Sequence, residues 1–260
     1  MIQVFKIGGN VIESDSMLEK FCREFAAVPS PRILVHGGGV SASALQTALG
    51  QTPVKIEGRR VTDENALKVV VMMYAGWCNK LLVSKLQKYG CNAIGLSGCD
   101  GNVIKAPKRP PCLLSDGKTL VDFGYVGEVM KESVNISLLN DMLSAGLVPV
   151  LSPVNHDGNG QLLNTNADSI ASSVAAALGA RLVLCFEMDG VLYDRNDPSS
   201  VIPEMNEAMF RDLISGGVIS EGMIPKISGA LRSLEYGACQ AVIKSAARIS
   251  DESGTRIVKM

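Results

Sequence analysis

Short apolar segments alternate with stretches of helical periodicity along most of this chain. The apolar segments at 3–7 and 32–35 run directly into glycines, in Lys6-Ile-Gly-Gly9 and His36-Gly-Gly-Gly39. Further segments that read as buried strands lie at 92–96, 148–151, 182–186, 241–244 and 256–258. Because alternating strands and helices favour a parallel sheet covered on both faces, the pattern predicts a three-layer αβα sandwich. We expect a mostly parallel central sheet, folded as a single domain over residues 1–260.

Capping residues and helical spacing predict where the helices between these strands begin. A polar patch at 14–16 can cap a helix whose inward positions are Leu18, Phe21, Cys22 and Phe25. Thr62 is predicted to cap a long helix to about Tyr89, with an apolar stripe that serves as core or as a dimer face. Ser137 is predicted to cap the helix 137–145. Further helices are expected at 41–49, 169–178, 207–215 and 226–236, a small β excursion at 53–61, and hairpins at a sheet edge within 99–131.

Composition and charge exclude several classes of function. The chain has 260 residues, 47% of them apolar, and a formal net charge of −1, whereas a generic nucleic-acid binder needs a basic surface. Its apolar runs are too short to span a bilayer, and it begins in a strand with no signal peptide pattern. Seven scattered cysteines read as reduced thiols of a cytoplasmic protein. With only His36 and His156, no protein-built metal site is predicted.

The phosphate motifs that this chain lacks narrow the chemistry. It contains no P-loop sequence, no Gly-x-Gly-x-x-Gly after the first strand and no Gly-x-Ser-x-Gly. It does contain two glycine loops, Lys6, an arginine pair at 59–60, the cluster Asn164-x-Asn-Ala-Asp168 and a late Lys226. Phosphoryl transfer needs cations on both sides of the moving group, N–H donors and Mg²⁺. Two lysines from opposite ends of the chain meet that demand.

These motifs, taken in order, resemble the amino acid kinase family, and within it they are most similar to the N-acetylglutamate kinases. The resemblance extends almost from end to end. Its most specific parts are the blocks Gly58-Arg-Arg-Val-Thr-Asp63 and Asn164-x-Asn-Ala-Asp168, while the glycine motifs are shared by the whole family. The remaining matching blocks are Lys6-Ile-Gly-Gly9, His36-Gly-Gly-Gly39, Asn79-Lys80 and Gly222-Met-Ile-Pro-Lys226.

The resemblance implies a catalytic centre and a reaction. Lys6 and Lys226 would neutralise charge on the transferring phosphoryl group from opposite sides, and Asp168 would accept bonds from both lysines. The γ-carboxylate of N-acetyl-L-glutamate would become an acyl phosphate at the expense of ATP, with Mg²⁺ bound mainly through the nucleotide phosphates. Residues to about 165 would form the acceptor lobe, and residues from about 166 to 260 the nucleotide lobe.

The resemblance also implies the binding residues. Gly8 and Gly9 would donate N–H groups to the ATP phosphates. The residues that would bind the acceptor are Gly38 and Gly39 at one carboxylate, Arg60 at the α-carboxylate and Asn164 at the acyl-amino end. The residues that would line the adenine–ribose site are Glu187, Met188, Gly190 and Ser220. His36 is expected to be a structural histidine, because phosphorylation of a carboxylate needs no proton removed.

Two departures from the family pattern leave alternatives open. Relatives usually have Thr/Ser-Asp where this chain has Phe186-Glu187, and an aliphatic residue where it has Arg59. Arg59, or Lys108 or Arg109 of the hairpin region, could bind a third carboxylate, so N-succinyl-L-glutamate is an alternative substrate. Another small acceptor of the same family, or a silent ligand-binding module on the same fold, is also possible. Because Met1 lies at the first strand, we expect a homodimer that is insensitive to arginine.

Each residue singled out also has a structural alternative when taken alone. Lys226 could be a surface lysine near a helix start. Asp168 could be an acid in the first turn of a helix, where the dipole favours it. Asn164 and Asn166 could be turn residues. The combination in one chain, rather than any single residue, supports the kinase interpretation.

Overall fold

The structure, a computed structural model, describes residues 1–29, 31–114, 116–219 and 222–259. Its central element is an eight-stranded sheet in the order β12-β14-β13-β11-β1-β2-β8-β5. All neighbours from β13 to β5 are parallel, which confirms the predicted sheet. β14 runs antiparallel to β13 and parallel to β12, an edge that the sequence pattern did not predict. The strands are β1 (Gln3–Ile7), β2 (Arg32–His36), β5 (Ala93–Leu96), β8 (Val148–Leu151), β11 (Arg181–Phe186), β12 (Glu204–Met205), β13 (Gln240–Ser245) and β14 (Thr255–Ile257).

β1 lies where the strand order reverses. On one side it pairs with β2, and Lys6 is in register with Val35; on the other side it pairs with β11, and Lys6 is in register with Leu184. In open α/β sheets, ligands bind outside the carboxyl ends of the strands at such a reversal. Both predicted glycine loops follow strands that end at this point.

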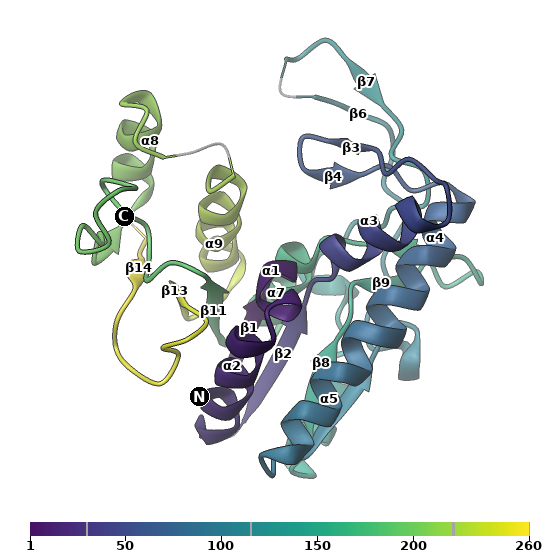
Figure 1. The fold of residues 1–260 in the computed structure, drawn as a ribbon, viewed down its shortest axis with the longest axis horizontal. Helices are drawn as coiled ribbons and strands as arrows, with labels where there is room; N and C mark the ends of the chain where they lie inside the picture. The colour runs from purple at the N-terminus through teal and green to yellow at the C-terminus, as the bar shows by residue number, and fades with distance from the viewer. Residues whose placement is uncertain (30, 115, 220–221, 260) are drawn as a thin grey trace.

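Helices cover both faces of the sheet because successive side chains of a strand alternate between them. Val4 packs in the core formed with α7 and α9, while Phe5 and Ile7 pack in the core formed with α2 and α5. The helices are α1 (Gly9–Glu13), α2 (Asp15–Ala27), α3 (Gly39–Ala48), α4 (Glu64–Val70), α5 (Asn79–Lys88), α6 (Ile136–Ser144), α7 (Ala167–Ala177), α8 (Glu207–Ser215) and α9 (Ile224–Tyr236), with the short 3₁₀ turns η2 (Asp100–Asn102) and η3 (Lys131–Ser133). The three-layer prediction is therefore confirmed (Figure 1).

The helix caps test the predictions made from polar residues. Ser14 caps α2 as expected, since its side chain accepts from the Met17 N–H. Thr62 does not cap the long helix: Asp63 accepts from the Ala66 N–H at 2.7 Å, and Thr62 is buried and bonded elsewhere. Ser137 was also a wrong choice, because the side chain of Asn135 caps α6.

The long helix after Asp63 is continuous but changes its winding. α4 passes into a π-helical segment, η1 (Val71–Cys78), and then into α5. The span Glu64–Lys88 is long and apolar enough to cross a membrane by length and composition alone, contrary to the sequence prediction. However, 44% of its most apolar window is buried inside the protein, and α5 packs against α2, β5 and β8. The helix thus packs on one face of the sheet as part of the core.

Three two-stranded hairpins lie outside the main sheet. β3 (Lys55–Ile56) pairs with β4 (Arg59–Arg60), β6 (Cys112–Leu113) with β7 (Leu120–Val121), and β9 (Val154–His156) with β10 (Leu162–Asn164). The predicted β excursion at 53–61 is confirmed. The hairpin within 99–131 exists but forms its own pair rather than a sheet edge. In Figure 1 the first two hairpins lie beyond α3 at the top of the picture, with their turns directed toward the half that carries α8 and α9.

Candidate active site

Lys6 and Asp168 form an ion pair at the carboxyl end of β1. The Lys6 Nζ lies 2.8 Å from the Asp168 Oδ1, and the lysine is only 6% exposed. Asp168 sits in the first turn of α7, where the Asn166 side chain caps the helix and accepts from the N–H groups of Asp168 and Ser169. The cap therefore fixes the backbone that directs the carboxylate toward β1.

Lys226 reaches the same place from the first turn of α9. Its Nζ lies 4.1 Å from the centroid of the Phe186 ring, and the Lys6 Nζ lies 5.4 Å from the same centroid. Burial and the charge of Lys6 lower the pKa of Lys226, while the carboxylates of Asp168 and Glu187 act in the opposite direction. The structure brings the three predicted catalytic residues together. The prediction had Asp168 bonded to both lysines, but the ion pair that it forms within 4 Å among the described residues is with Lys6.

The two glycine loops pass close to each other beside these lysines. The Gly37 N–H donates to the Ile7 carbonyl at 3.0 Å. A Cβ on Gly9 would lie 3.3 Å from the Val40 Cγ2 and 3.5 Å from the Val40 nitrogen, so a side chain there would be tightly packed against the start of α3. No side chain caps the start of α3 after Gly38, which leaves helix N–H groups available to an anion.

His36 stabilises the second glycine loop through a hydrogen bond to its backbone. Its Nδ1 lies 2.7 Å from the Gly37 carbonyl oxygen, and its Nε2 lies 3.1 Å from the Asn79 Nδ2. A carbonyl only accepts and an amide nitrogen only donates, so His36 is neutral and carries its proton on Nδ1. Burial lowers the pKa of His36 to about 4. Both ring nitrogens are satisfied, as expected for a structural histidine.

Arg60 lies at the start of α3, next to the second glycine loop. Its Nη2 donates to the Gly39 carbonyl at 2.9 Å and to the Ser43 Oγ at 2.7 Å, and its Nη1 donates to the Gln46 Oε1. Arg60 is 6% exposed, and its Nε has no partner among the described residues. The structure thus places Arg60 and Gly39 together, as the sequence prediction required.

Asn164 ends the β9–β10 hairpin and joins the same region. Its Nδ2 donates to the Thr62 Oγ1 at 3.0 Å, and the Thr62 hydroxyl donates to the Arg60 carbonyl at 3.1 Å. The Asn164 Oδ1 is buried and lacks a partner within the described part of the chain. A buried acceptor without a donor costs free energy, so this oxygen is suited to an N–H of a bound ligand.

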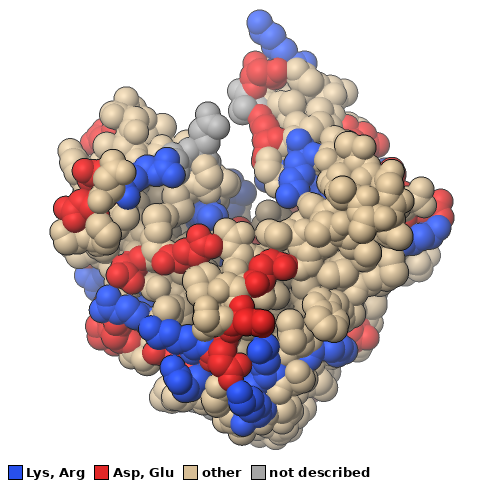
Figure 2. Space-filling model, in the orientation of Figure 1, with Lys and Arg blue, Asp and Glu red and all other residues tan. Residues whose placement is uncertain are grey.

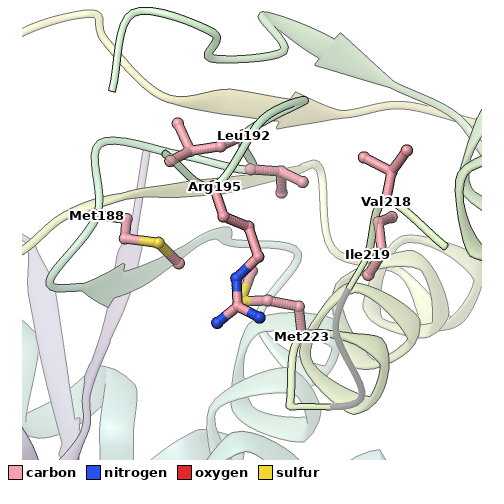
Figure 3. A pocket seen from close by; sticks show the side chains of 7 residues that line it. Met188, Leu192, Arg195, Val218, Ile219 and Met223 are labelled. Carbon is pink, nitrogen blue, oxygen red and sulfur yellow. The ribbon is translucent and has the colours of Figure 1, made fainter. Parts of the chain in front are cut away.

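A largely apolar pocket lies between the loop after β11 and the start of α9. Its lining residues are Met188, Val191, Leu192, Arg195, Val218, Ile219 and Met223. Figure 3 shows the Arg195 side chain extending from its loop, with Met188 on one side and Met223 on the other. Of the four residues predicted for a nucleotide site, Met188 lines this pocket and Ser220 lies outside the described residues.

The other two predicted nucleotide residues do not line the pocket. Gly190 packs against the protein, since a Cβ there would lie 2.8 Å from the Thr255 Oγ1 and from the Val201 Cγ1. Glu187 is exposed and contributes charge near Lys226. Of the predicted residues that the structure describes, Met188 therefore lines the pocket, while lining residues such as Arg195 and Met223 carry no local sequence signal.

Sequence reasoning also missed residues around Arg60. Ser43, Gln46 and Tyr74 contact it from α3 and η1, which are distant in sequence and have no motif of their own. Lys55 lies directly opposite Arg60 across β3–β4, and burial and the charge of Arg60 lower its pKa. The sequence did contain a signal for the position of Lys55, because the two-residue turn Glu57-Gly58 fixes the β3–β4 register that places Lys55 opposite Arg60.

A hollow separates the two halves of the molecule above this site. Figure 2 shows it between the half that carries α8 and α9 and the half that carries α3 and the hairpins, with Lys and Arg side chains on both walls. Cationic side chains that face each other across a concave site are suited to binding a polyanion.

Comparison with known proteins identifies the family to which this arrangement belongs. A model of the amino acid kinase family matches residues 1–245. The chain therefore belongs to the amino acid kinase family, as its motifs predicted, and it is a kinase. This family uses ATP and small-molecule substrates.

Individual relatives match nearly the whole chain. A Bacteroides thetaiotaomicron protein named acetylglutamate kinase is 45% identical over 262 residues, covering 99% of this chain and 98% of the relative. A Methanopyrus kandleri protein of the same name is 39% identical over 255 residues, covering 98% and 99%. The solved structure of smu.665 from Streptococcus mutans matches with a TM-score of 0.77 at 28% identity, covering 99% and 98%.

Proposed function

We propose that this kinase transfers the γ-phosphoryl group of ATP to the γ-carboxylate of N-acetyl-L-glutamate, giving an acyl phosphate in arginine biosynthesis. The observation that carries the proposal is the meeting of Lys6, Lys226 and Asp168 beside two glycine loops. Relatives named acetylglutamate kinase, 39–45% identical over nearly the full chain, support the choice of acceptor.

ATP would occupy the side of the hollow formed by the nucleotide lobe, from about 166 to 260. Its phosphates would accept from the N–H groups of Gly8 and Gly9, where the backbone carries no Cβ and can approach an anion closely. Its base would enter the apolar pocket at Met188. Among the described residues no three His, Cys, Asp or Glu side chains are grouped, so Mg²⁺ would be held mainly through the nucleotide phosphates, where it neutralises charge.

The acceptor would occupy the lobe formed by residues 1 to about 165. Arg60 would bind its α-carboxylate, and the N–H groups at Gly38 and Gly39 would bind the carboxylate that is phosphorylated. The amide N–H of the N-acyl group would donate to the buried Asn164 Oδ1, which has no other partner among the described residues. Both carboxylates and the amide N–H of an N-acylated glutamate then have a counterpart.

The chemistry that follows is positioning and charge neutralisation. Lys6 from β1 and Lys226 from α9 would approach the moving phosphoryl group from two sides, and Asp168 would keep Lys6 oriented. The acceptor carboxylate is already ionised at neutral pH, so no general base is needed. The neutral His36 accordingly stays out of the reaction and shapes the loop.

An acceptor panel tests this function. ADP release should be measured with N-acetyl-L-glutamate, N-succinyl-L-glutamate, glutamate, aspartate and carbamate, and N-acetyl-L-glutamate should give the highest kcat/KM. Arg59 is exposed and alternates with the buried Arg60 along β4, so Arg59→Leu should leave this ranking unchanged. A preference of the wild type of roughly tenfold for the N-succinyl substrate, the value of one charge-assisted bond, would contradict the acetyl assignment. If that preference disappeared in Arg59→Leu, Arg59 would be the residue responsible for it.

We further propose that two copies pair through the outward face of the long helix. Met72 is 51% and Trp77 63% exposed on η1, and large exposed apolar side chains in one place indicate a protein interface. Trp77→Glu should therefore convert a dimer into a monomer in light scattering. Tyr236→Glu, at a 55% exposed aromatic residue on α9, is the matched control and should stay dimeric. A dimer that persists in Trp77→Glu would show that another surface pairs.

The seven cysteines are all present as free thiols in the structure. We propose a cytoplasmic location for this enzyme, in keeping with the sequence prediction. Thiols remain reduced in that compartment.

A further inference from the structure

Tyr74 contacts the acceptor side of the site, although its position in the sequence suggested only a core residue. It lies in the π-helical segment η1 and is 6% exposed. A Cβ on Gly38 would lie 2.7 Å from the Tyr74 Cδ1 and 3.0 Å from its Cε1. The ring is thus packed directly against the second glycine loop. π-helical turns are frequent at functional sites, and here the turn directs an aromatic ring toward one.

The hydroxyl of Tyr74 extends past this contact to Arg60. A Cβ on Gly39 would lie 3.7 Å from the hydroxyl oxygen. Burial raises the pKa of Tyr74, while the charge of the Arg60 guanidinium and a hydrogen bond with it act to lower that pKa. The hydroxyl therefore lies at the meeting point of Arg60 and Gly39.

The direction of that hydrogen bond leaves one proton available. A guanidinium has only N–H donors, so Arg60 donates and the Tyr74 oxygen accepts. The phenolic proton then remains to be donated to an acceptor of its own. Hydrogen bonds to oxygen atoms of α3 fix the position of the Arg60 guanidinium. A negatively charged ligand group that bound beside the guanidinium would therefore face the Tyr74 hydroxyl as well.

We propose that Tyr74 is an acceptor-binding residue, whose hydroxyl donates to the carboxylate of the acceptor that Arg60 binds while its ring fixes Gly38. The proposal rests on the proposed function, because it needs a carboxylate acceptor at Arg60. It adds a residue that belongs to none of the motifs in this chain. It also gives η1 a direct part in substrate binding.

Tyr74→Phe tests the proposal, because it removes the hydroxyl and keeps the ring against Gly38. The dissociation constant of the acceptor, measured by calorimetry, and its KM should each rise about tenfold, as for one lost bond to a charged group. The KM for ATP, kcat and the thermal midpoint should change little. Tyr236→Phe, on the exposed end of α9, is the matched control and should bind the acceptor like the wild type.

Two results would overturn the proposal. An unchanged acceptor dissociation constant in Tyr74→Phe would mean that the hydroxyl does not reach the ligand. Equal losses in acceptor binding, ATP binding and thermal midpoint would mean that Tyr74 acts only in packing. If the wild type instead uses a different carboxylate acceptor, the proposed function fails, and the same comparison made with that acceptor still tests Tyr74.

Discussion

Replacing either Lys6 or Lys226 by alanine should lower kcat by roughly 10²–10³, the usual cost of losing one group that stabilises charge in the transition state. Both ammonium groups lie near the same Phe186 ring, at 5.4 and 4.1 Å from its centroid, so each alanine variant removes one of two cations from the site. Turnover should be measured by ADP release at saturating ATP and acceptor. Lys20→Ala, at an exposed position on α2, is the control and should keep wild-type turnover.

The two lysine variants should also differ in their pH dependence. Lys6 lowers the pKa of Lys226 by charge repulsion, so removing Lys6 should raise the pKa of Lys226. Any residual activity of Lys6→Ala should then persist to higher pH than that of the wild type. Lys6→Arg should recover only part of the loss, because a planar guanidinium fills space differently from an ammonium. Near wild-type turnover in either alanine variant would refute the assigned chemistry.

Arg60→Lys should raise the KM of the acceptor by between tenfold and a hundredfold while changing kcat much less. A lysine keeps the charge but cannot bond the Gly39 carbonyl, Ser43 and Gln46 at once, nor bind a carboxylate through two parallel bonds. Each lost bond to a charged group is worth about 1.5–3 kcal/mol, and tenfold corresponds to about 1.4 kcal/mol.

The neighbouring arginine supplies the matched control for this variant. Arg59 belongs to the same two-residue strand but is exposed, so Arg59→Lys should keep the KM of the acceptor. Steady-state kinetics with varied acceptor at fixed ATP separate KM from kcat. Equal KM values for the two variants would remove Arg60 from the acceptor site.

Much of the site was readable from the sequence because its residues follow strands or precede helices. Lys6 ends a buried strand, and Asp168 begins a capped helix, so local patterns place both at the sheet's carboxyl edge. The parallel order of the central strands then brings them together. The antiparallel edge formed by β14 has no such signal, because the direction of a short apolar segment depends on the path of the chain before it.

The residues that were missed depend on packing between distant segments. Tyr74 reads as one position in an apolar stripe, and only the winding of η1 turns its hydroxyl toward Arg60. Thr62 looked like a helix cap, since threonine is a common capping residue. Tertiary structure instead buries it between Arg60 and Asn164, where its hydroxyl bonds both.

Phe186 was noted in the sequence as a departure from the family pattern, and the structure gives it a physical role. Its ring centroid lies 5.4 Å from the Lys6 Nζ and 4.1 Å from the Lys226 Nζ, and the attraction of a cation to an aromatic face helps to hold both side chains in place. Relatives with Thr/Ser at this position would need a different means of holding the two lysines.

The long helix presents two faces, and this arrangement has a consequence for inhibition. Tyr74 and Asn79 point inward to Gly38 and His36, while Met72 and Trp77 point outward. A small apolar molecule that took the place of the second copy on the outward face would contact η1 opposite the glycine loop and would disturb that loop from outside the active site. Such a compound would weaken acceptor binding without resembling either substrate, and because this coupling is reciprocal, a higher concentration of the acceptor would oppose the inhibition.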